Sequence, residues 1–524
     1  MSANRIFMST PITVRNLTPT SISIKRIEHF EDADALQSKA GGYLFSTRRT
    51  TPAIPSQSKL GQHAESFTHQ DMDIGLAPFQ SVTIGQPMQE ESHGIASSTS
   101  KTLRLTIESA EGLRHRIDAQ PSHTQKSSRS SLPLSAGSSS SYTALFHPSK
   151  PTAHLTIHTH HALNYAKWMS ALPDTLPLSA ISIPGTHNSH THYRALPSVR
   201  CQVVDVATQL ANGIRSLDIR VQPVHATDTT KKDLYLVHGA FPVSLTGPKY
   251  LVPILQTCYT FLAANPSETI LISLKREGIG SATDQHLATI LQEHYISPNA
   301  SYWYTDTAIP YLGAARGKLV LIRRYNQPPT STPIGLDATP WPHNATHALF
   351  PSNTPHPLFC LQDFCEILVP GDIPTKLQVS NEHLVRAAAA QHHIPGVTTD
   401  AKNPVPPGPL YLNFLSGSNF WNKGCWPEVI ARKVNKGMEE WLCIGHHVCE
   451  EGASTREPGK LGAGREDGVE ADGSGYGVRS KKEGDGGTGI VVMDCVGEGG
   501  DWDLVRLVIG MNMGVLEKCR GGKV

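Results

Sequence analysis

Four short apolar segments of the chain end in side chains that could act on a phosphodiester. The segments are ISIPGTH (181–187), SLDIRV (216–221), LYLVHG (234–239) and TILISLK (269–275), and their polar residues are His187, Asp218 with Arg220, His238 and Lys275. One imidazole could take a proton from an attacking hydroxyl and the other could protonate the leaving oxygen, while a guanidinium neutralises the phosphate. The set predicts acid/base cleavage of a phosphodiester. Because the chain has 26 histidines, each of them taken alone is better explained as an ordinary polar residue.

The elements that must position these residues are buried strands that alternate with helices. Further candidate strands are KLVLIRR (318–324), LFCLQDF (358–364), YLNFLSG (411–417) and GIVVMDC (489–495). The candidate helices are ATQLANGI (207–214), ILQTCYTFLAANP (254–266), TDQHLATILQEHY (283–295) and EHLVRAAAAQH (382–392). Such alternation favours a (β/α) barrel, whose chemistry lies at the C-terminal ends of the strands. We therefore expect an α/β barrel domain over residues 161–524.

The first 160 residues have a different pattern and predict a small β-rich, sandwich-like module. Short alternating β-branched runs at 10–32, 80–84, 102–109 and 153–157 are typical of strands. The polar stretch 35–75 is interpreted as a long loop. The Ser-rich segment 119–141 and the Gly-rich, charged segment 450–487 are predicted to be disordered. The Pro-rich loop 325–350, which contains Trp341, is either a cap over the barrel mouth or an ordinary surface loop.

Length and charge limit the classes of function. A chain of 524 residues is long enough for two units, and a net charge of +1 gives no general reason to expect a nucleic-acid partner. No apolar run of roughly 18 residues and no secretory signal pattern are found, so we expect a cytoplasmic protein. The nine cysteines include no C-x-x-C pair, which argues against a disulfide scaffold or a zinc ribbon. Cys360 and Cys365 are interpreted as buried or free thiols.

Two histidine clusters could be mistaken for zinc sites. The first comprises His158, His160 and His161, which we interpret as part of a solvated linker between the modules. The second combines His187 with His190 and His192. It would require a strand-end histidine to turn toward a loop, so neither cluster is expected to bind metal.

From Trp168 onward the chain resembles the catalytic X-type domain of phosphatidylinositol-specific phospholipase C, especially the single-domain bacterial enzymes and their fungal relatives. The resemblance rests on segments in family order over about 340 residues. These are ISIPGTHNSHT (181–191), GIRSLDIRV (213–221), LYLVHG (234–239), ETILISLKRE (268–277), RGKLVLIRRYN (316–326), LQDF (361–364), YLNFLSGS (411–418) and VVMDCVGEGGDWDLVRLVIGMN (491–512). The resemblance implies an irregular TIM-type barrel, in agreement with the strand-end pattern.

The resemblance also implies a role for individual residues. His187 corresponds to the general base that activates the inositol 2-hydroxyl, and Asp494 to its orienting carboxylate. His238 corresponds to the general acid, and Arg220 to the guanidinium that binds the phosphate. The positions that line the head-group pocket in the family correspond to Asp218, Lys275, Arg324 and Asp363.

Two residues depart from the bacterial pattern. Asn188 replaces an aspartate that directly follows the base, and an amide keeps the hydrogen-bond geometry without the negative charge. An asparagine here also resembles the calcium-dependent eukaryotic enzymes, but Arg220 and Lys275 stand where those have acidic ligands, so we expect a metal-independent site without cofactor. Cys365 stands where the bacterial pattern has an aromatic residue that stacks on the inositol ring.

The function that the resemblance implies is cleavage of phosphatidylinositol-type lipids through a cyclic inositol phosphate. The expected partners are a phosphoinositide or another phosphodiester and, transiently, a membrane surface. One alternative is another phosphodiesterase on the same barrel, although such enzymes use acidic metal ligands near the first histidine and Arg220 argues against them. Another alternative is a weak or inactive lipid-binding protein that its N-terminal module targets to membranes.

Overall fold

The structure is a computed structural model that describes twelve stretches of the chain. They are residues 9–31, 68–86, 101–119, 129–130, 132–134, 142–147, 152–159, 164–196, 198–351, 356–448, 478–479 and 482–521. The chain forms two compact units, the first from residues 1–160 with 443–482 and the second from 161–442 with 483–524. Most of the segments predicted to be disordered, 119–141 and 450–487, lies outside the described residues. Short strands occur within both, at 129–130, 132–133 and 478–479.

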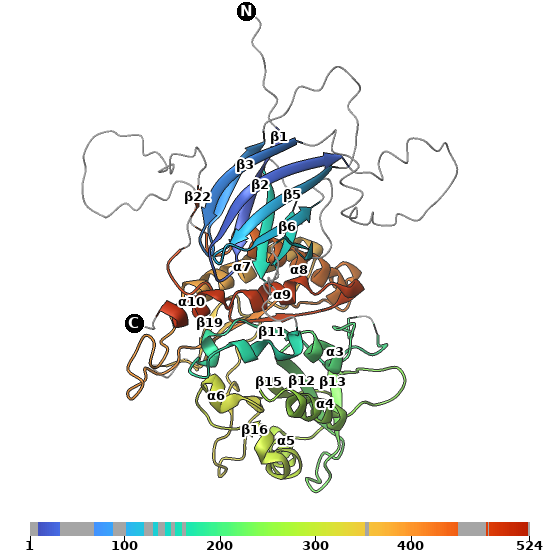
Figure 1. Ribbon diagram of the computed structural model, residues 1–524. Coiled ribbons are helices and arrows are strands. Elements are labelled where there is room, and N and C mark those ends of the chain that lie inside the picture. The colour runs from blue at the N-terminus through green and yellow to red at the C-terminus, as the bar shows by residue number, and fades with distance from the viewer. Residues whose placement is uncertain are drawn as a thin grey trace, which may run out of the picture. The chain divides into compact units, whose positions relative to one another are not determined.

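The first unit is β-rich and contains two sheets (Figure 1). One sheet has the order β22-β4-β1-β10-β9-β7 and the other the order β3-β2-β5-β6-β8. The strands are β1 (Ser9–Leu17), β2 (Ile22–Glu31), β3 (Thr68–Leu76), β4 (Ser81–Gln86), β5 (Lys101–Ser109), β6 (Arg114–Ala119), β7 (Arg129–Ser130), β8 (Leu132–Pro133), β9 (Tyr142–His147), β10 (Ala153–Thr159) and β22 (Val478–Arg479).

The alternating apolar residues of this unit form one core. Val14 and Ile84 from the first sheet and Ile24 and Leu105 from the second belong to the same buried cluster. Alternation of this kind places every second side chain on one face of a strand, which explains why β1, β2, β4, β5 and β10 are evident from the sequence.

Besides the two-residue strands β7, β8 and β22, three strands of this unit were not predicted, namely β3, β6 and β9. The interpretation of 35–75 as a loop is wrong for its last residues, which belong to β3. The sequence of β6, RHRIDA, contains one large apolar residue, so it lacks the pattern of a half-buried strand. Pairing with β5 accounts for it, and Arg104 donates to Asp118 across the pair at 2.8 Å. The interpretation of His158 as part of a solvated linker is wrong. It is 3% exposed in β10, and its ring lies 2.8 Å from Oγ1 of Thr143, whereas His160 and His161 lie outside the described residues.

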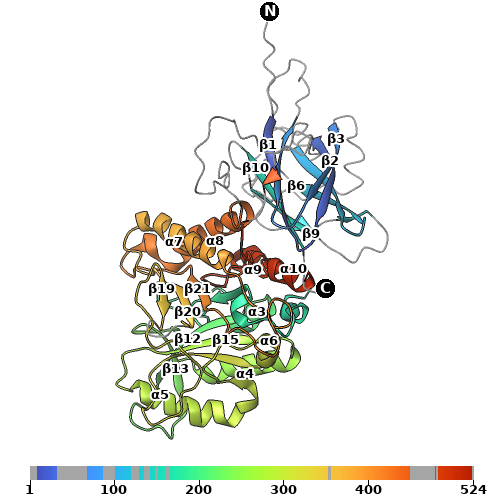
Figure 2. The same ribbon diagram turned by 90° about the vertical axis from the view of Figure 1, so that its left-hand side faces the viewer.

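The second unit is mixed α/β and is built around one long sheet (Figure 2). The main path through the sheet is β16-β17-β15-β12-β11-β23-β21-β20-β19, with β13, β14 and β18 attached at its sides. The strands are β11 (Ile183–Thr186), β12 (Ser216–Pro223), β13 (Leu234–His238), β14 (Phe241–Pro242), β15 (Ile270–Arg276), β16 (Trp303–Tyr304), β17 (Leu319–Arg324), β18 (Leu336–Asp337), β19 (Ala348–Phe350), β20 (Phe359–Gln362), β21 (Leu410–Phe414) and β23 (Ile490–Met493).

All eight strands predicted for this part of the chain are present. The pairs from β17 through β15, β12, β11, β23 and β21 to β20 are parallel. The first and last strands of the series, β11 and β23, are neighbours, so the strands follow each other around the sheet in chain order. Among the described residues no pairing joins β17 to β20, and the short strands β18 and β19 flank that opening.

One strand differs from the predicted β/α alternation. β13 pairs with β12 in the antiparallel sense, with Val221 opposite Leu236 and Pro223 opposite Leu234. The chain therefore turns back after β12, and the end of β13 returns beside the middle of β12. This reversal brings His238 close to Arg220, whose positive charge acts on its ring.

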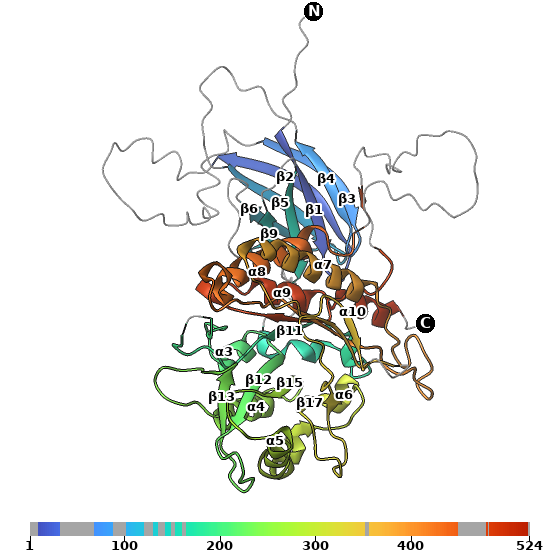
Figure 3. The same cartoon turned by 180° about the vertical axis from the view of Figure 1, so that it is seen from behind.

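The helices of the second unit include all four that were predicted. They are α3 (Val206–Ala211), α4 (Leu251–Ala264), α5 (Asp284–Leu291), α6 (Leu312–Ala315), α7 (Ile373–Ala389), α8 (Pro427–Ile444), α9 (Asp503–Gly510) and α10 (Met513–Gly521), and α7 and α8 lie side by side in Figure 3. Two of these helices have a side-chain N-cap. Asp205 accepts a hydrogen bond from the amide of Thr208 at the start of α3, and Thr283 accepts one from the amide of His286 at the start of α5. No helix in the described part of the chain is long and apolar enough to span a bilayer.

Candidate active site

Strand register gathers the charged side chains into one row. Arg220 of β12 pairs with Lys275 of β15, and Lys275 pairs with Arg324 of β17. Three cations on parallel neighbouring strands thus stand at one level of the sheet. Thr186, the last residue of β11, pairs with Leu217 on one side and Met493 on the other. The residues one step further along these three strands, His187, Asp218 and Asp494, are therefore neighbours.

His187 and Asp494 form an oriented pair. Nδ1 of His187 lies 2.9 Å from Oδ1 of Asp494, which assigns its proton to Nδ1 and leaves a lone pair on Nε2. Burial raises the pKa of the Asp494 carboxyl group, and its ion pair with His187 opposes that shift. The side chain of His187 is 13% exposed and lines the cavity, so a substrate can reach its ring. The pair has the geometry of a general base held by a carboxylate.

Asn188 follows the base in a left-handed backbone conformation with φ of 42°. Its amide N–H donates to Oδ2 of Asp218 at 3.2 Å, and its side-chain Nδ2 lies 3.1 Å from Nε2 of His187. The side chain is fully buried and its Oδ1 has no hydrogen-bond partner. Asn188 therefore contributes to the position of the base rather than lining the cavity.

Arg220 lies between two carboxylates and the base. Its guanidinium donates to Asp218 at 3.2 Å and to Glu277 at 3.1 Å, and Nη2 lies 3.1 Å from Nε2 of His187. Burial alone would lower the pKa of Arg220, but Asp218 and Glu277 outweigh it and raise that pKa. In turn, burial raises the pKa of Asp218, but Arg220 and Arg324 hold it well below its usual range. The guanidinium is thus a fixed positive charge beside the base.

Glu277 is a site residue that the sequence analysis missed. Its carboxylate accepts from Arg220, from Nζ of Lys275 at 2.9 Å and from the amide of Gly239 at 2.8 Å. Although burial raises the pKa of Glu277, Arg220 and Lys275 lower it to about 2. Glu277 directly follows β15, two residues after Lys275, and its amide still donates to the carbonyl of Val221, so the shared face could have been inferred from the alternation of side chains.

His238 reaches the same region from β13. Its Nδ1 lies 2.9 Å from the carbonyl oxygen of Val199, which assigns the proton to Nδ1 and leaves Nε2 available. The rings of His187 and His238 are perpendicular, with centroids 6.0 Å apart. Burial, together with the positive charge of Arg220, lowers the pKa of His238 to about 3. Without a bound anion, His238 is therefore neutral at physiological pH.

These residues surround a cavity of about 520 Å³ in the second unit. The lining comprises His187, Arg220, His238, Lys275, Glu277, Arg324, Ala338, Thr339, Trp341, His343, Asp363, Cys365, Glu366, Ser416, Gly417 and Ser418. It includes six of the nine residues predicted for the site. The other three, Asn188, Asp218 and Asp494, lie behind the lining and contact His187 or Arg220. Four lining residues come from loop 325–350, so this loop borders the cavity.

The aromatic surface of the cavity comes from Trp341. The Arg324 guanidinium lies 3.7 Å from the centre of the Trp341 ring, and the indole Nε1 donates to Asp363 at 2.9 Å. These two contacts hold the ring in the wall of the cavity, which Cys365 also lines. The chain thus has an aromatic side chain in the cavity although position 365 is a cysteine. The sequence singled out the loop but did not assign this role to Trp341.

Two carboxylates beside the base that could hold a hard cation are already paired with cationic side chains. Asp218 and Glu277 both bind the guanidinium of Arg220, and Lys275 binds Glu277 as well. A divalent ion at the same place would meet two fixed positive charges. A softer set, His187 with Cys201 and Asp494, does lie within ligand distance. His190 and His192 are not part of that set, since Nε2 of His190 bonds to the carbonyl of Val237.

Comparison with known proteins finds one family. The model described as "Phosphatidylinositol-specific phospholipase C, X domain" matches residues 175–325. The chain is 35% identical over 167 residues to a 1-phosphatidylinositol phosphodiesterase of Listeria monocytogenes, covering 30% of this chain and 48% of the relative. It is 29% identical over 191 residues to the protein of that name from Staphylococcus aureus strain Newman, covering 34% of this chain and 58% of the relative. The matched segment thus spans about half the length of these relatives.

A solved structure is similar over more of the chain. It is the phosphatidylinositol-specific phospholipase C from Listeria monocytogenes, with a TM-score of 0.43 and 21% identity. The similarity covers 67% of this chain and 99% of that one.

Proposed function

Through residues 175–325 the chain belongs to the phosphatidylinositol-specific phospholipase C X-domain family, and from this premise we propose that it cleaves phosphatidylinositol-type lipids without a metal. One observation carries the proposal. His187, whose Nδ1 pairs with Asp494 at 2.9 Å, lines one cavity together with Arg220, whose guanidinium lies 3.1 Å from Nε2 of that histidine. The named relatives are 1-phosphatidylinositol phosphodiesterases.

The first step is attack of the inositol 2-hydroxyl on phosphorus. Nε2 of His187 takes the hydroxyl proton while a bond forms between that oxygen and phosphorus. Asp494 accepts a hydrogen bond from the Nδ1–H group, which keeps the lone pair on Nε2. Its negative charge also stabilises the imidazolium that forms. Because nucleophile and phosphate belong to one molecule, attack needs no second bound reactant.

The second step is protonation of the leaving oxygen. His238 donates a proton from Nε2 as the bond between phosphorus and the diacylglycerol oxygen breaks, which gives a 1,2-cyclic phosphate and an alcohol. In the free protein the low pKa of His238 opposes this role. A bound phosphodiester adds a negative charge beside the ring and favours its protonated form. The substrate itself therefore prepares the acid.

Arg220 binds the phosphate through the transition state. Its position is held by Asp218 and Glu277, so the guanidinium presents its charge without reorganisation as negative charge builds on the oxygens. Lys275, Arg324 and Asp363 are proposed to bind the inositol hydroxyls.

Trp341 is proposed to supply the apolar surface for the inositol ring. It lines the same cavity as Cys365, the position at which the bacterial pattern has its aromatic residue, and two contacts hold its ring in place. We therefore propose that Trp341 replaces the aromatic residue that Cys365 lacks, so that the head group is still recognised.

A membrane surface is the proposed partner during turnover. Large apolar side chains are exposed on loops that follow the cavity-lining residues of several strands; they are Leu245 (55% exposed), Ile279 (86%), Leu368 (62%), Val369 (52%) and Trp421 (89%). Exposure of such side chains to water is unfavourable, and insertion into a lipid interface would remove them from water. Phe241 and Phe420 stack between two of these loops, with ring centroids 5.1 Å apart.

The finer description of the fold is also part of the proposal. We infer that the sheet of the second unit is an irregular TIM-type barrel, open between β17 and β20, because its parallel strands follow in chain order and β11 pairs with β23. The first unit is inferred to be a β-sandwich in which both sheets share one core. The domain boundary is proposed near residue 160, with the catalytic residues all beyond it.

The test is incubation of the protein with phosphatidylinositol vesicles, followed by identification of the water-soluble product. We expect inositol 1,2-cyclic phosphate and diacylglycerol. Vesicle binding without product would instead favour an inactive lipid-binding protein, and a non-cyclic product from another substrate would favour a different phosphodiesterase. Either result would overturn the proposed reaction.

A further inference from the structure

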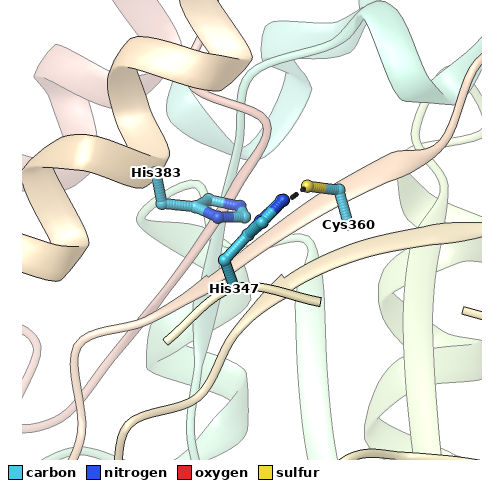
Figure 4. Close-up of side chains that lie close together, drawn as sticks. All are labelled: His347, Cys360 and His383. Carbon is cyan, nitrogen blue, oxygen red and sulfur yellow. Dashed lines mark hydrogen bonds between the residues drawn. The ribbon is translucent and has the colours of Figure 1, made fainter. Parts of the chain in front are cut away.

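A second group of metal-ligand side chains lies in the second unit, outside the cavity lining. His347 directly precedes β19, Cys360 lies in β20 and His383 lies in α7. One ligand atom of each lies within 4.8 Å of the other two. Figure 4 shows the three side chains converging, with Sγ of Cys360 3.8 Å from Nδ1 of His347 and the ring of His383 beside them. A β-hairpin and a helix thus deliver a thiol and two imidazoles to one point.

His383 is buried without a hydrogen bond that would compensate. Its side chain is 0% exposed, and neither Nδ1 nor Nε2 has a hydrogen-bond partner. The ring of Tyr411 covers it, with centroids 5.8 Å apart. A buried polar group that loses water and gains no partner is unfavourable, so such a group calls for an explanation. A metal ion bound to the imidazole lone pair provides one.

The electrostatics keep both imidazoles in the form that binds metal. Burial, and then the positive charge of Arg386, lower the pKa of His383 to about 3, and the same two causes lower the pKa of His347. Both shifts favour the neutral imidazole. Burial raises the pKa of Cys360 to about 11, while Arg386 favours its thiolate. The thiol would lose its proton only on binding a cation.

We propose that His347, Cys360 and His383 bind one zinc ion through two imidazole nitrogens and a thiolate. This donor set suits zinc and excludes Ca²⁺ and Mg²⁺, which require oxygen ligands. Binding forms one Zn–S and two Zn–N bonds, displaces water from the ion and releases the Cys360 proton to solvent. Ligand atoms around tetrahedral zinc lie roughly 3.3–3.7 Å apart, whereas here they lie within 4.8 Å of one another. Binding of the ion therefore requires side-chain shifts of about 1 Å.

The site would join α7 to the β19–β20 hairpin. His347 is exposed, so a water molecule can complete the tetrahedron on its side. A second link between the same elements already exists, since Nζ of Lys376 in α7 donates to Gln362 in β20 at 3.1 Å. β20 leads directly into Asp363, which lines the cavity. The zinc would thus link α7 to the β19–β20 hairpin, and its binding does not depend on the proposed catalytic function.

The experiment measures zinc bound by the full chain after dialysis against a moderate chelator. We expect about one equivalent in the parent protein and its loss in Cys360→Ala and His347→Ala. His347 is exposed, so its variant should fold even if the variant at the buried cysteine does not. Matched controls are Cys258→Ala, at a buried cysteine of α4, and His356→Ala, at an exposed histidine of the same region. Both controls should retain the zinc.

Further readouts separate this site from the catalytic one. His187→Ala removes a ligand of the other candidate set and should leave the zinc content unchanged. Cobalt added to the metal-free protein should give a thiolate-to-metal absorption band that is absent in Cys360→Ala. No bound zinc in the parent, or equal zinc in the parent and in His347→Ala, would overturn the proposal. Loss of zinc in His187→Ala would assign the metal to the set of His187, Cys201 and Asp494, and would also overturn the proposal.

Discussion

Replacement of Asp494 by asparagine tests the orientation of the base. The carboxylate accepts the Nδ1 proton of His187 at 2.9 Å and is 1% exposed, so no water can take its place. The amide nitrogen of an asparagine can donate to Nδ1 instead, which would move the ring proton to Nε2 and remove the lone pair from the attacking hydroxyl. The isosteric change thus disables the base without creating a cavity.

The expected size of the effect follows from the role of the pair. General-base catalysis contributes about 10²–10⁴-fold, and loss of an orienting aspartate has cost about 10⁴-fold where it holds a catalytic histidine. At 1.36 kcal/mol for each factor of ten, the barrier should rise by about 3–5 kcal/mol. We therefore expect Asp494→Asn to lose at least about a hundredfold in turnover of phosphatidylinositol vesicles, measured as cyclic phosphate released.

Asp485 offers a matched control. It is also a buried aspartate in contact with a histidine, with Oδ2 3.1 Å from Nδ1 of His392, but it lies outside the cavity lining. Asp485→Asn should lose thermal stability and keep its turnover. If Asp494→Asn stays within about fivefold of the parent while folded by circular dichroism, or if both variants lose turnover alike, the assignment of the base is wrong.

Three further predictions concern the acid, the residue after the base and pH. His238→Ala and His187→Ala should each reduce turnover at least about a hundredfold, as measured by initial rates on vesicles, and near-parental rates in either would contradict its role. Asn188→Asp should raise the rate in the presence of chelator, because a carboxylate there raises the pKa of His238; a lower rate would argue against the bacterial-type mechanism. Burial lowers the pKa of His190 to about 4, whereas the unfolded chain protonates it near 6.5. The contribution of His190 to the free energy of unfolding is therefore full above about pH 6.5 and falls by up to about 1.4 kcal/mol per pH unit toward pH 4. Denaturant titrations at several pH values should show a smaller fall for His190→Gln. An equal fall in the parent and the variant would contradict this contribution.

The residues that end strands were the part of the site that the sequence could predict. His187, Arg220 and Lys275 each end or nearly end an apolar run, and parallel strands bring such positions together. Glu277 lay beyond the predicted end of its strand and was missed, although its spacing from Lys275 placed it on the same face. His238 was predicted for the site, but its antiparallel strand was not.

Contacts between distant segments were beyond prediction from local patterns. Trp341 gains its place from Arg324 and Asp363, which pair with it only after the sheet forms. His347 and His383 stand far apart in the sequence on either side of Cys360, with no spacing that is typical of a zinc motif. The register of β19 and β20 and the packing of α7 decide that they meet.

The central claim, that the guanidinium of Arg220 does the work of a metal ion, is tested most directly by one comparison of rates. Cleavage of phosphatidylinositol by the parent and by Arg220→Lys is measured in millimolar EDTA, then with Ca²⁺ or Zn²⁺ restored separately. The parent should be unaffected by loss of Ca²⁺. A loss that Zn²⁺ alone restores would be assigned to the His347 cluster or to the His187 set by the zinc content of His347→Ala and His187→Ala. Arg220→Lys should lose most activity, because lysine keeps the charge but lacks the planar pair of donors. Loss of the parent's activity in EDTA with rescue by Ca²⁺, or an Arg220→Lys enzyme as fast as the parent, would contradict the claim.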